Sequence, residues 1–349
     1  MLENSWHKKE KPLFGLTGLG GGVGSNLVGG GGGDPVYVDD VFSVDLWEGT
    51  GSAQTITNGI DLDGEGGLVW SKNRGSSVSH LLNDSARGIE SGSYYSELVS
   101  DTDGINAKYT PWGATAFNSN GFSLGGSNSQ FNLNGDDYVS WTFRKAPGFF
   151  DVVTYTGNDT AGRTISHNLG SAPGMIIVKD LDATNWWICY HRSMGNTKGM
   201  YLNDNGAESD QLFWNDTDPT STEFTVGIIT NNNANGHDYV AYIFAHDDQS
   251  FGAGGNESII KCDYYWGNST AGKAINLGFE PQFLLLKSTS YRNWFIWRDS
   301  NKALFPDLNL AEINYGDAMA FTSTGFTVSS GGDTNTSGEK YTYMAIAAP

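Results

Sequence analysis

Three stretches of ten residues decide how this sequence is interpreted: "NSNGFSLGGS" at 118–127, "TSTEFTVGII" at 220–229 and "TSTGFTVSSG" at 322–331. They place Phe122, Phe224 and Phe326 at matching positions, each 102 residues from the next. A short polar run, a Phe between small or β-branched residues and a Gly or Ser turn are typical of a β-strand with tight turns at both ends. The recurrence indicates that one structural unit is repeated three times.

Other segments repeat at the same interval. Downstream, "GDDYVSWTFR", "GHDYVAYIFA" and "GEKYTYMAIA" align Tyr138, Tyr239 and Tyr341. Upstream, "GGLVWSKNR", "GMIIVKDLD" and "QFLLLKSTS" align their lysines, and "NWWICYHRS" matches "NWFIWRDS" with "SHLLNDS" as a weaker first copy. We therefore predict three modules, at residues 42–146, 147–252 and 253–349, behind an N-terminal segment of residues 1–41. A period of about a hundred residues suits a small domain with its own core better than a solenoid repeat.

The composition predicts an all-β fold of antiparallel β-sandwich modules, jelly-roll or lectin-like in kind. Aromatic residues make up 13% of the chain and charged residues only 17%, with 47 glycines, which favours short strands joined by tight turns over long helices. The runs "MIIVK" (175–179) and "FLLLK" (283–287) predict strands buried on both faces. "NWFIWRDS" and "DYVAYIFAHD" alternate as half-exposed strands do.

The N-terminal segment predicts an extended docking arm. Between Gly15 and Gly33, eleven of nineteen residues are glycine. This segment therefore has too few apolar side chains to fold alone. Because the apolar stretch is broken by glycines and no Ala-x-Ala-like site follows, we expect the segment to belong to the mature protein rather than to a secretory signal. Aromatic and aliphatic anchors precede the glycines and suit an arm that docks into a larger assembly, a flexible linker being the alternative: Trp6, Leu13, Phe14 and Leu16.

One stretch resembles a nucleotide-binding loop. "GNSTAGKA" (267–274) is one residue away from G-x-x-x-x-G-K-[ST], with Ala274 in place of the metal-binding hydroxyl. A phosphate loop needs a helix directly after its lysine, and Gly278 and Pro281 would break one within two turns. The second repeat carries a twin, "GNDTAGRT" (157–164), in the same context. The stretch therefore predicts a hairpin-like turn, and no cofactor is expected.

Other chemistry is weakly indicated. The histidines and the two isolated cysteines, Cys189 and Cys262, form no zinc motif, and the cysteines are expected to be small buried hydrophobes. "DLDGEGG" (61–67) partly resembles a Ca²⁺ loop but lacks most of its ligands. No catalytic residue can be assigned; a glycosidase-like carboxylate pair stays open, although triplication argues against it. Four tryptophans could form a sugar-stacking face or fill the core and the module interfaces, the reading we favour: Trp186, Trp187, Trp294 and Trp297.

Charge and hydropathy limit the partners. The formal net charge is −19, so binding to nucleic acid or to an anionic membrane surface is not expected. No run of about 18 apolar residues is present, so membrane insertion is not expected either.

The residues also resemble a known family. "YTGNDTAGRTISHNLGSAPGMIIVK", "WWICYHRSMGNTK" and "DYVAYIFAHD" look like a repeat domain widespread in tailed phages, especially marine ones, and the first repeat looks like the companion module that usually precedes it. "MLENSWHKKEKPLFGLTGLGGG" (1–22) resembles a leader of virion proteins of such phages. The third repeat departs most, because it loses the "SHNLGSAP" spelling.

The resemblance implies a non-enzymatic virion structural protein on the exterior of the tail or head, made in the host cytoplasm. We expect a tail-fibre or adhesin-like appendage that binds other virion proteins and a host-surface glycan or receptor. A homo-oligomer is expected, a homotrimer being the common arrangement for fibres. The alternatives are a head decoration or tail-associated protein, and, from another class, a glycan-degrading tail enzyme.

Overall fold

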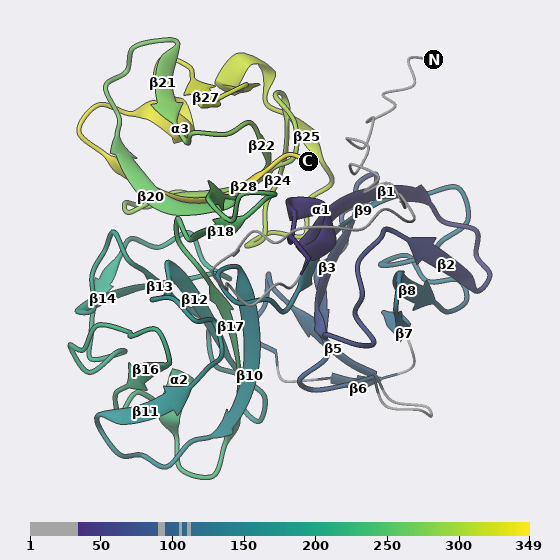
Figure 1. Ribbon diagram of the computed structural model, residues 1–349, viewed down its shortest axis with the longest axis horizontal. Coiled ribbons are helices and arrows are strands. Elements are labelled where there is room, and N and C mark those ends of the chain that lie inside the picture. The colour runs from purple at the N-terminus through teal and green to yellow at the C-terminus, as the bar shows by residue number, and fades with distance from the viewer. Residues whose placement is uncertain (1–33, 90–94, 105–106, 110–112) are drawn as a thin grey trace, which may run out of the picture.

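The computed structural model describes residues 34–349 except 90–94, 105–106 and 110–112 (Figure 1). The predicted all-β fold of antiparallel β-sandwiches is confirmed. Each large sheet takes its strands from one repeat, and we call the three units sandwich 1, 2 and 3 in chain order. The helical elements in the described residues are single turns: α1 (Val38–Val41), α2 (Thr230–Asn233), η1 (Gly316–Ala318) and α3 (Gly332–Asn335).

Sandwich 1 sets the pattern. Its six-stranded sheet has the order β1-β9-β3-β4-β5-β6, and its three-stranded sheet has the order β2-β8-β7. The strands are β1 (Phe42–Glu48), β2 (Gln54–Thr57), β3 (Gly67–Asn73), β4 (Leu81–Asp84), β5 (Tyr95–Val99), β6 (Ala107–Tyr109), β7 (Ala114–Asn118), β8 (Gly121–Leu124) and β9 (Asp137–Arg144).

Sandwich 2 repeats this topology with a two-stranded small sheet. The large sheet has the order β10-β17-β12-β13-β14-β15, and β11 pairs with β16. The strands are β10 (Phe150–Thr156), β11 (Arg163–Ser166), β12 (Met175–Asp180), β13 (Ile188–His191), β14 (Lys198–Tyr201), β15 (Ser209–Asp210), β16 (Glu223–Val226) and β17 (Asp238–Phe244).

Sandwich 3 has the orders β20-β28-β22-β23-β24-β25 and β21-β27-β26, and the hairpin β18-β19 connects it to sandwich 2. The strands are β18 (Gln249–Phe251), β19 (Glu257–Ser258), β20 (Ile260–Trp266), β21 (Lys273–Asn276), β22 (Pro281–Ser288), β23 (Phe295–Trp297), β24 (Lys302–Leu304), β25 (Ile313–Asn314), β26 (Met319–Thr322), β27 (Gly325–Val328) and β28 (Lys340–Ala347).

The repeated phenylalanine joins the two sheets of each sandwich. Phe224 of the small sheet meets the Tyr155 ring edge-on at 6.2 Å, and Tyr155 stacks on Tyr239 at 5.1 Å. Phe326 meets Tyr265 at 6.0 Å, and Tyr265 stacks on Tyr341 at 5.0 Å. Edge-to-face and offset-stacked rings are favoured arrangements of aromatic pairs, so this trio fixes the spacing of the sheets.

Sandwich 1 has the same trio with one exchange. Phe122 meets the Trp47 ring edge-on at 6.0 Å, and Trp47 stacks on Tyr138 at 5.5 Å. A tryptophan therefore takes the place of the first tyrosine. Because the same three positions make the same contacts in every copy, the ten-residue stretches mark where each sandwich closes.

The large sheets bury their second faces against one another. Along β28, Tyr341, Tyr343 and Ala345 belong to the core of sandwich 3, whereas Met344 and Ile346 join a core shared with sandwiches 1 and 2. The largest apolar cluster draws residues from all three sandwiches, so the expectation of a separate core in each module holds only in part: sandwiches 1 and 3 also keep apolar clusters of their own. For the same reason "DYVAYIFAHD" and "NWFIWRDS" are not half-exposed, since β17 beyond its first residue and all of β23 are buried. The prediction of burial on both faces for β12 and β22 is confirmed.

Phe143 lies where the three sheets meet. Its ring centroid is 5.5 Å from that of Phe244 in sandwich 2 and 6.0 Å from that of Phe283 in sandwich 3. Phe42, at the start of β1, lies 4.9 Å from the same ring. Figure 1 shows the three units grouped around this centre rather than strung out in a row.

The chain reaches this centre through α1. Val38 and Val41 are buried in the shared core, and the Val36 carbonyl accepts a hydrogen bond from the Gly252 amide at 2.9 Å. Residues 38–41, which we had assigned to the arm, therefore pack with the folded body. The anchors Trp6, Leu13, Phe14 and Leu16 lie outside the described residues.

The shared core generates the first prediction. Phe143→Ala should lower the free energy of unfolding by about 3–5 kcal/mol, because it leaves a cavity that no single sandwich can close. Phe321→Ala, which truncates a partly buried ring at the rim of sandwich 3, should cost less than half as much. Urea unfolding followed by tryptophan fluorescence measures both, and equal losses would contradict a shared core.

Candidate functional site

The predicted aromatic contact residues are mostly interior. Trp187, Trp294 and Trp297 are 0%, 2% and 0% exposed, so they offer no sugar-stacking face, and the packing interpretation describes them. Trp186 is 43% exposed, with its ring edge-on to Tyr201 at a centroid distance of 4.7 Å. Only this one of the four can contact a partner without rearrangement.

Two of the buried tryptophans connect sandwiches. The Trp187 indole N–H donates to the Val99 and Thr102 carbonyls of sandwich 1, both at 3.1 Å. The Trp294 indole N–H donates to the Tyr201 carbonyl of sandwich 2 at 2.8 Å. Sandwich 2 is thus fastened to 1, and sandwich 3 to 2, by the same position of the repeat.

The contact between sandwiches 1 and 3 closes the three sandwiches into a ring. His80 occupies the equivalent position in sandwich 1; it is fully buried, and its Nδ1 accepts a hydrogen bond from the Trp70 indole at 3.2 Å. Ser100 of sandwich 1 donates to the Pro306 carbonyl of sandwich 3 at 2.6 Å, and Arg74 pairs with Glu312 at 2.9 Å. Sandwich 1 therefore lies against sandwich 3, and each unit contacts both others.

The aligned lysines repeat this pattern without exposure to solvent. Lys179 donates to the Asp103 carbonyl of sandwich 1 at 3.1 Å, and Lys287 donates to the Gly206 carbonyl of sandwich 2 at 3.0 Å. Burial lowers the pKa of each, and that of Lys72, to about 8. Carbonyl oxygens from two chain segments satisfy the ammonium groups of Lys179 and Lys287, so these two lysines fasten one unit to the preceding one.

Lys72 departs from its two counterparts. Its ammonium donates to the carbonyls of Asn73 and Ser76, both in sandwich 1. Within the described part of the chain it makes no hydrogen bond to sandwich 3. The junction that closes the ring thus lacks the lysine bridge present at the other two.

The stretch "GNSTAGKA" forms the turn that its context predicts. The side chain of Asn268 accepts a hydrogen bond from the Thr270 amide at 3.0 Å, and Ser269 and Gly272 have φ angles of 53° and 73°. Lys273 begins the strand β21, not a helix. The twin turn at Asn158 has the same side-chain bond to Thr160, at 3.1 Å. The expectation of a turn that leads into a strand is confirmed, but the turn is not a hairpin, because β20 and β21 belong to different sheets.

Few described residues offer metal or redox chemistry. No group of three or more His, Cys, Asp or Glu in the described ranges could hold a metal ion, the stretch 61–67 included. Cys189 and Cys262 are free and buried, and burial raises the pKa of both thiols, so they are poor nucleophiles.

His191 lies at the junction between sandwiches 2 and 3. Its Nε2 is 3.0 Å from the Tyr343 carbonyl, and because a carbonyl only accepts, this nitrogen carries the proton. Nδ1 accepts from the Ser193 hydroxyl at 2.8 Å. Burial lowers the pKa of His191 to about 3, so the ring is neutral at neutral pH.

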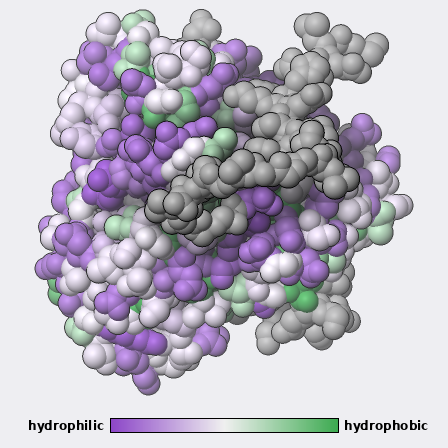
Figure 2. All heavy atoms as spheres, viewed as in Figure 1, coloured by the Kyte–Doolittle hydropathy of each residue, from purple (hydrophilic) through white to green (hydrophobic). Residues whose placement is uncertain are grey.

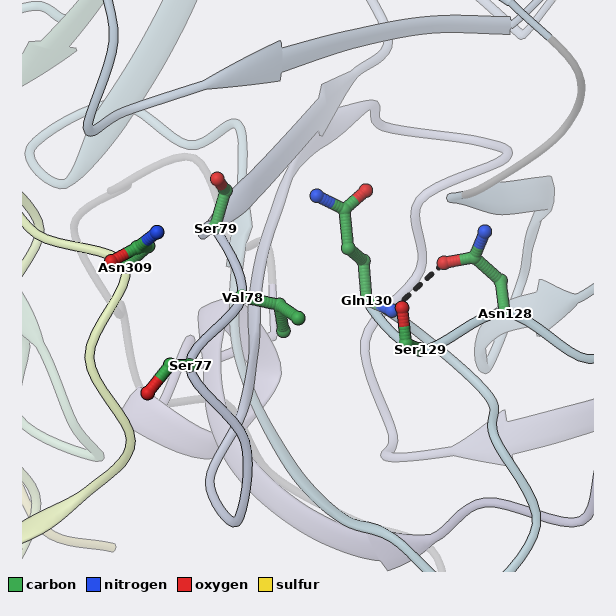
Figure 3. Close-up of a pocket in the computed structure, with 7 residues that line it drawn as sticks. All are labelled: Ser77, Val78, Ser79, Asn128, Ser129, Gln130 and Asn309. Carbon is green, nitrogen blue, oxygen red and sulfur yellow. Dashed lines mark hydrogen bonds between the residues drawn. The ribbon is translucent and has the colours of Figure 1, made fainter.

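A pocket of about 370 Å³ opens where sandwich 1 meets sandwich 3 (Figure 3). It lies between the loop after β3, the loop after β8 and the loop after β24. Figure 3 shows these three segments facing one another, with the Gln130 side chain standing between those of Ser79 and Asn128. The lining residues are Ser77, Val78, Ser79, Asn128, Ser129, Gln130 and Asn309.

In the other two sandwiches, positions equivalent to the pocket lining bond across the corresponding loops. In sandwich 2, Asn231 donates to the Trp186 carbonyl at 3.2 Å. In sandwich 3, Arg292 pairs with Asp333 and with Glu339, both at 3.1 Å. Val78 occupies the place of Arg292 when the repeats are aligned on His80 and Trp294, and its side chain can form no such bond.

Sequence reasoning missed this pocket. Two signals were present: the weak match of "SSVSHLLNDS" (76–85) to the other two repeats, which places Val78 opposite Arg292, and the alignment of Tyr138 with Tyr341, which places Gln130 opposite Asp333. A repeat that loses a pairing residue on both sides of a contact leaves space there. The sequence alone did not show that sandwich 3 supplies the third wall, because the ring was not foreseen.

The fold and the site define an all-β protein built of three antiparallel sandwiches closed around one core. Within the described residues no helix is long and apolar enough to cross a membrane. The chain belongs to the family described as "Domain of unknown function (DUF7483)", whose model matches residues 38–349. The match begins at the first residue of α1 and runs through all three sandwiches. No curated protein matches the chain.

The lysine bridges generate the second prediction. Lys287→Met should lower the free energy of unfolding by about 2–4 kcal/mol, because buried carbonyls of two sandwiches lose their donor. Lys273→Met, at the first residue of β21, should change it by less than about 0.5 kcal/mol. Chemical denaturation at pH 7 measures both. An unchanged stability for Lys287→Met would show that the bridge contributes nothing.

The third prediction concerns acid stability. Since the unfolded chain protonates His191 near pH 6.5 and the folded chain only near pH 3, acidification through this window favours unfolding. Between pH 7 and pH 5 the wild type should lose about 2 kcal/mol relative to His191→Gln. Comparing the two proteins cancels the other titrating groups, such as Asp307, whose pKa burial raises to about 7. Parallel pH profiles would contradict the prediction.

Proposed function

We propose that this chain is a non-enzymatic structural protein of a phage virion, a tail-fibre or adhesin-like appendage that is attached by its N-terminal segment and contacts the host surface. The sequence resemblance of the repeats and of the leader supports the virion role. The observation that carries the attachment is the path of the chain: the family match begins at Val38, and the preceding residues join the folded body at its centre.

The place where the N-terminal segment enters the folded body suits a mechanical attachment. Val38 and Val41 are buried in the core that all three sandwiches share, and Val36 is hydrogen-bonded to Gly252 between sandwiches 2 and 3. A pull on the N-terminal segment is therefore distributed over three sandwiches instead of peeling one edge strand. Residues 1–33 would order against other virion subunits, as segments that fold on binding do.

The surface favours contact over catalysis. Polar residues cover most of the face seen in Figure 2, with hydrophobic residues scattered among them. The buried histidines, cysteines and lysines already have structural environments that perturb their titration in the direction of the neutral form. Loops at the sandwich junctions, including the one with Trp186, are the natural contact elements.

The ring also changes how avidity would arise. Three modules that projected outward separately would each make weak contacts. Because the sandwiches share one core, they form a single unit, so multivalency would come from several copies of the chain in a homo-oligomer or on one particle. A compact unit on a tether also suits a head decoration protein, and this is the second candidate.

Particle labelling tests the proposal. A protein lacking residues 1–33 should keep its cooperative melt but fail to enter particles, because the docking segment is gone. Antibody–gold against sandwich 3 should label intact wild-type particles, on the tail for the adhesin role or on the head for decoration. Normal incorporation of the truncated protein would refute the docking role, and the absence of gold would refute surface exposure.

A second experiment separates binding of host polysaccharide from its enzymatic degradation. Purified full-length protein should remain on host cells without releasing reducing ends from host polysaccharide. Release that is abolished by exchange of one acidic pair would establish the glycan-degrading enzyme instead.

A further inference from the structure

We propose that the pocket between sandwiches 1 and 3 binds a neutral sugar residue. The inference rests on the proposed surface-contact function, and it names the class of ligand and the place where it binds. Three observations carry it: the chemistry of the lining, the rigidity of the walls and the broken pairing that leaves the pocket open.

The lining offers hydrogen-bond donors and acceptors without charge. The Ser79 hydroxyl donates to Asp101 at 3.1 Å, so its oxygen faces a ligand as an acceptor. The Asn128 side-chain oxygen accepts from the Gln130 amide at 2.8 Å, which leaves the Asn128 amide nitrogen as a donor. The Gln130 Oε1 atom is buried and has no partner among the described residues. Because this atom is buried, a ligand in the pocket does not reach it, and Gln130 contributes through the rest of its polar side chain, which lines the pocket.

The walls are held before any ligand arrives. The Asn73 side chain donates to the Ser129 carbonyl at 2.7 Å, and the Tyr138 hydroxyl lies 3.1 Å from the same carbonyl. Asn73 also bonds Asp136 at 2.7 Å. Because the backbone of this loop is fixed from behind, binding would order little of the protein, which favours affinity for a small polar ligand.

The charge and the size of the pocket limit the class of ligand that it can bind. None of the seven lining residues is charged, the carboxylates of Asp101 and Asp136 hold the walls from behind, and the chain carries a net charge of −19. An anionic ligand is therefore disfavoured. No aromatic residue lines the pocket, and Val78 is its single aliphatic side chain, so a flat apolar ligand is not favoured either. A volume of about 370 Å³ lies at the small end of ligand sites and suits one or two sugar rings.

The pocket is open because sandwich 1 lacks the pairing present in sandwich 3. There Arg292 reaches Asp333 and Glu339; in sandwich 1 the aligned positions hold Val78, Gln130 and Asp136. The double substitution Val78→Arg with Gln130→Asp would restore that arrangement. It provides a variant that closes the pocket with contacts this fold already uses.

The test is a binding titration with the full-length protein. The probes are the methyl glycosides of glucose, galactose, mannose and N-acetylglucosamine, followed by saturation-transfer NMR, with N-acetylneuraminic acid as the anionic comparison. We expect at least one neutral glycoside to bind and the acid to bind more weakly or not at all. Gln130→Ala should weaken binding about tenfold, since a site built around ligand hydroxyls depends strongly on each polar partner.

Two further variants separate the site from general damage. The closing variant Val78→Arg with Gln130→Asp should abolish binding, and Gln249→Ala, at an exposed position of β18, should leave it unchanged. Melting temperatures establish that each variant is folded; if Gln130→Ala is not, the closing variant decides.

The outcomes are distinct from those of the proposed function. Absence of binding by all four glycosides, binding that neither pocket variant weakens, or preference for the anionic sugar would each overturn the pocket assignment. Particle labelling and cell retention are measured separately. Labelled particles that bind cells but no glycoside would refute the pocket alone, whereas glycoside binding by a protein absent from particles would refute the virion function alone.

Discussion

The central strands of each large sheet are buried on both faces, and the rest of the structure depends on that constraint. One face packs on the small sheet of its own sandwich, and the other packs on the large sheets of the two neighbours, with Phe143 where they meet. A polar residue in such a strand has no face on solvent and must find its partners inside the protein. All seven residues of β3 are buried, as are all six of β12.

Double-sided burial explains the lysines. Lys72, Lys179 and Lys287 lie near the ends of β3, β12 and β22, where the strands run out from the shared core. An ammonium there must find acceptors, and the nearest unpaired acceptors are carbonyls of loops. Where the loop belongs to the neighbouring sandwich, the lysine becomes a fastening; at the junction of sandwiches 3 and 1 it does not, and a pocket lies there instead.

Much of the fold could be predicted because the sequence repeats the pattern of one module three times. The aligned Phe224 and Tyr239 identify the strands and their sandwich, and the run "MIIVK" correctly predicts burial on both faces. The alternation in "DYVAYIFAHD" misled us, because period-two patterning cannot distinguish a solvent-facing tyrosine from one facing another sheet. Trp187 and Trp294 could not be placed for the same reason. The pocket depends on a contact between the first and last repeats, which local pattern does not encode.

The closure of the ring has a consequence for synthesis. Arg74 and Glu312, which pair across it, are separated by 238 positions of sequence. As the chain leaves the ribosome from its N-terminus, sandwich 1 can form early, but the outer face of its large sheet, with Leu68, Trp70 and Phe143, has no complete cover until sandwich 3 emerges. An apolar sheet waiting in water for its last partner is prone to pair with another nascent chain. The yield of folded protein thus depends on whether translation is completed before unfinished copies associate.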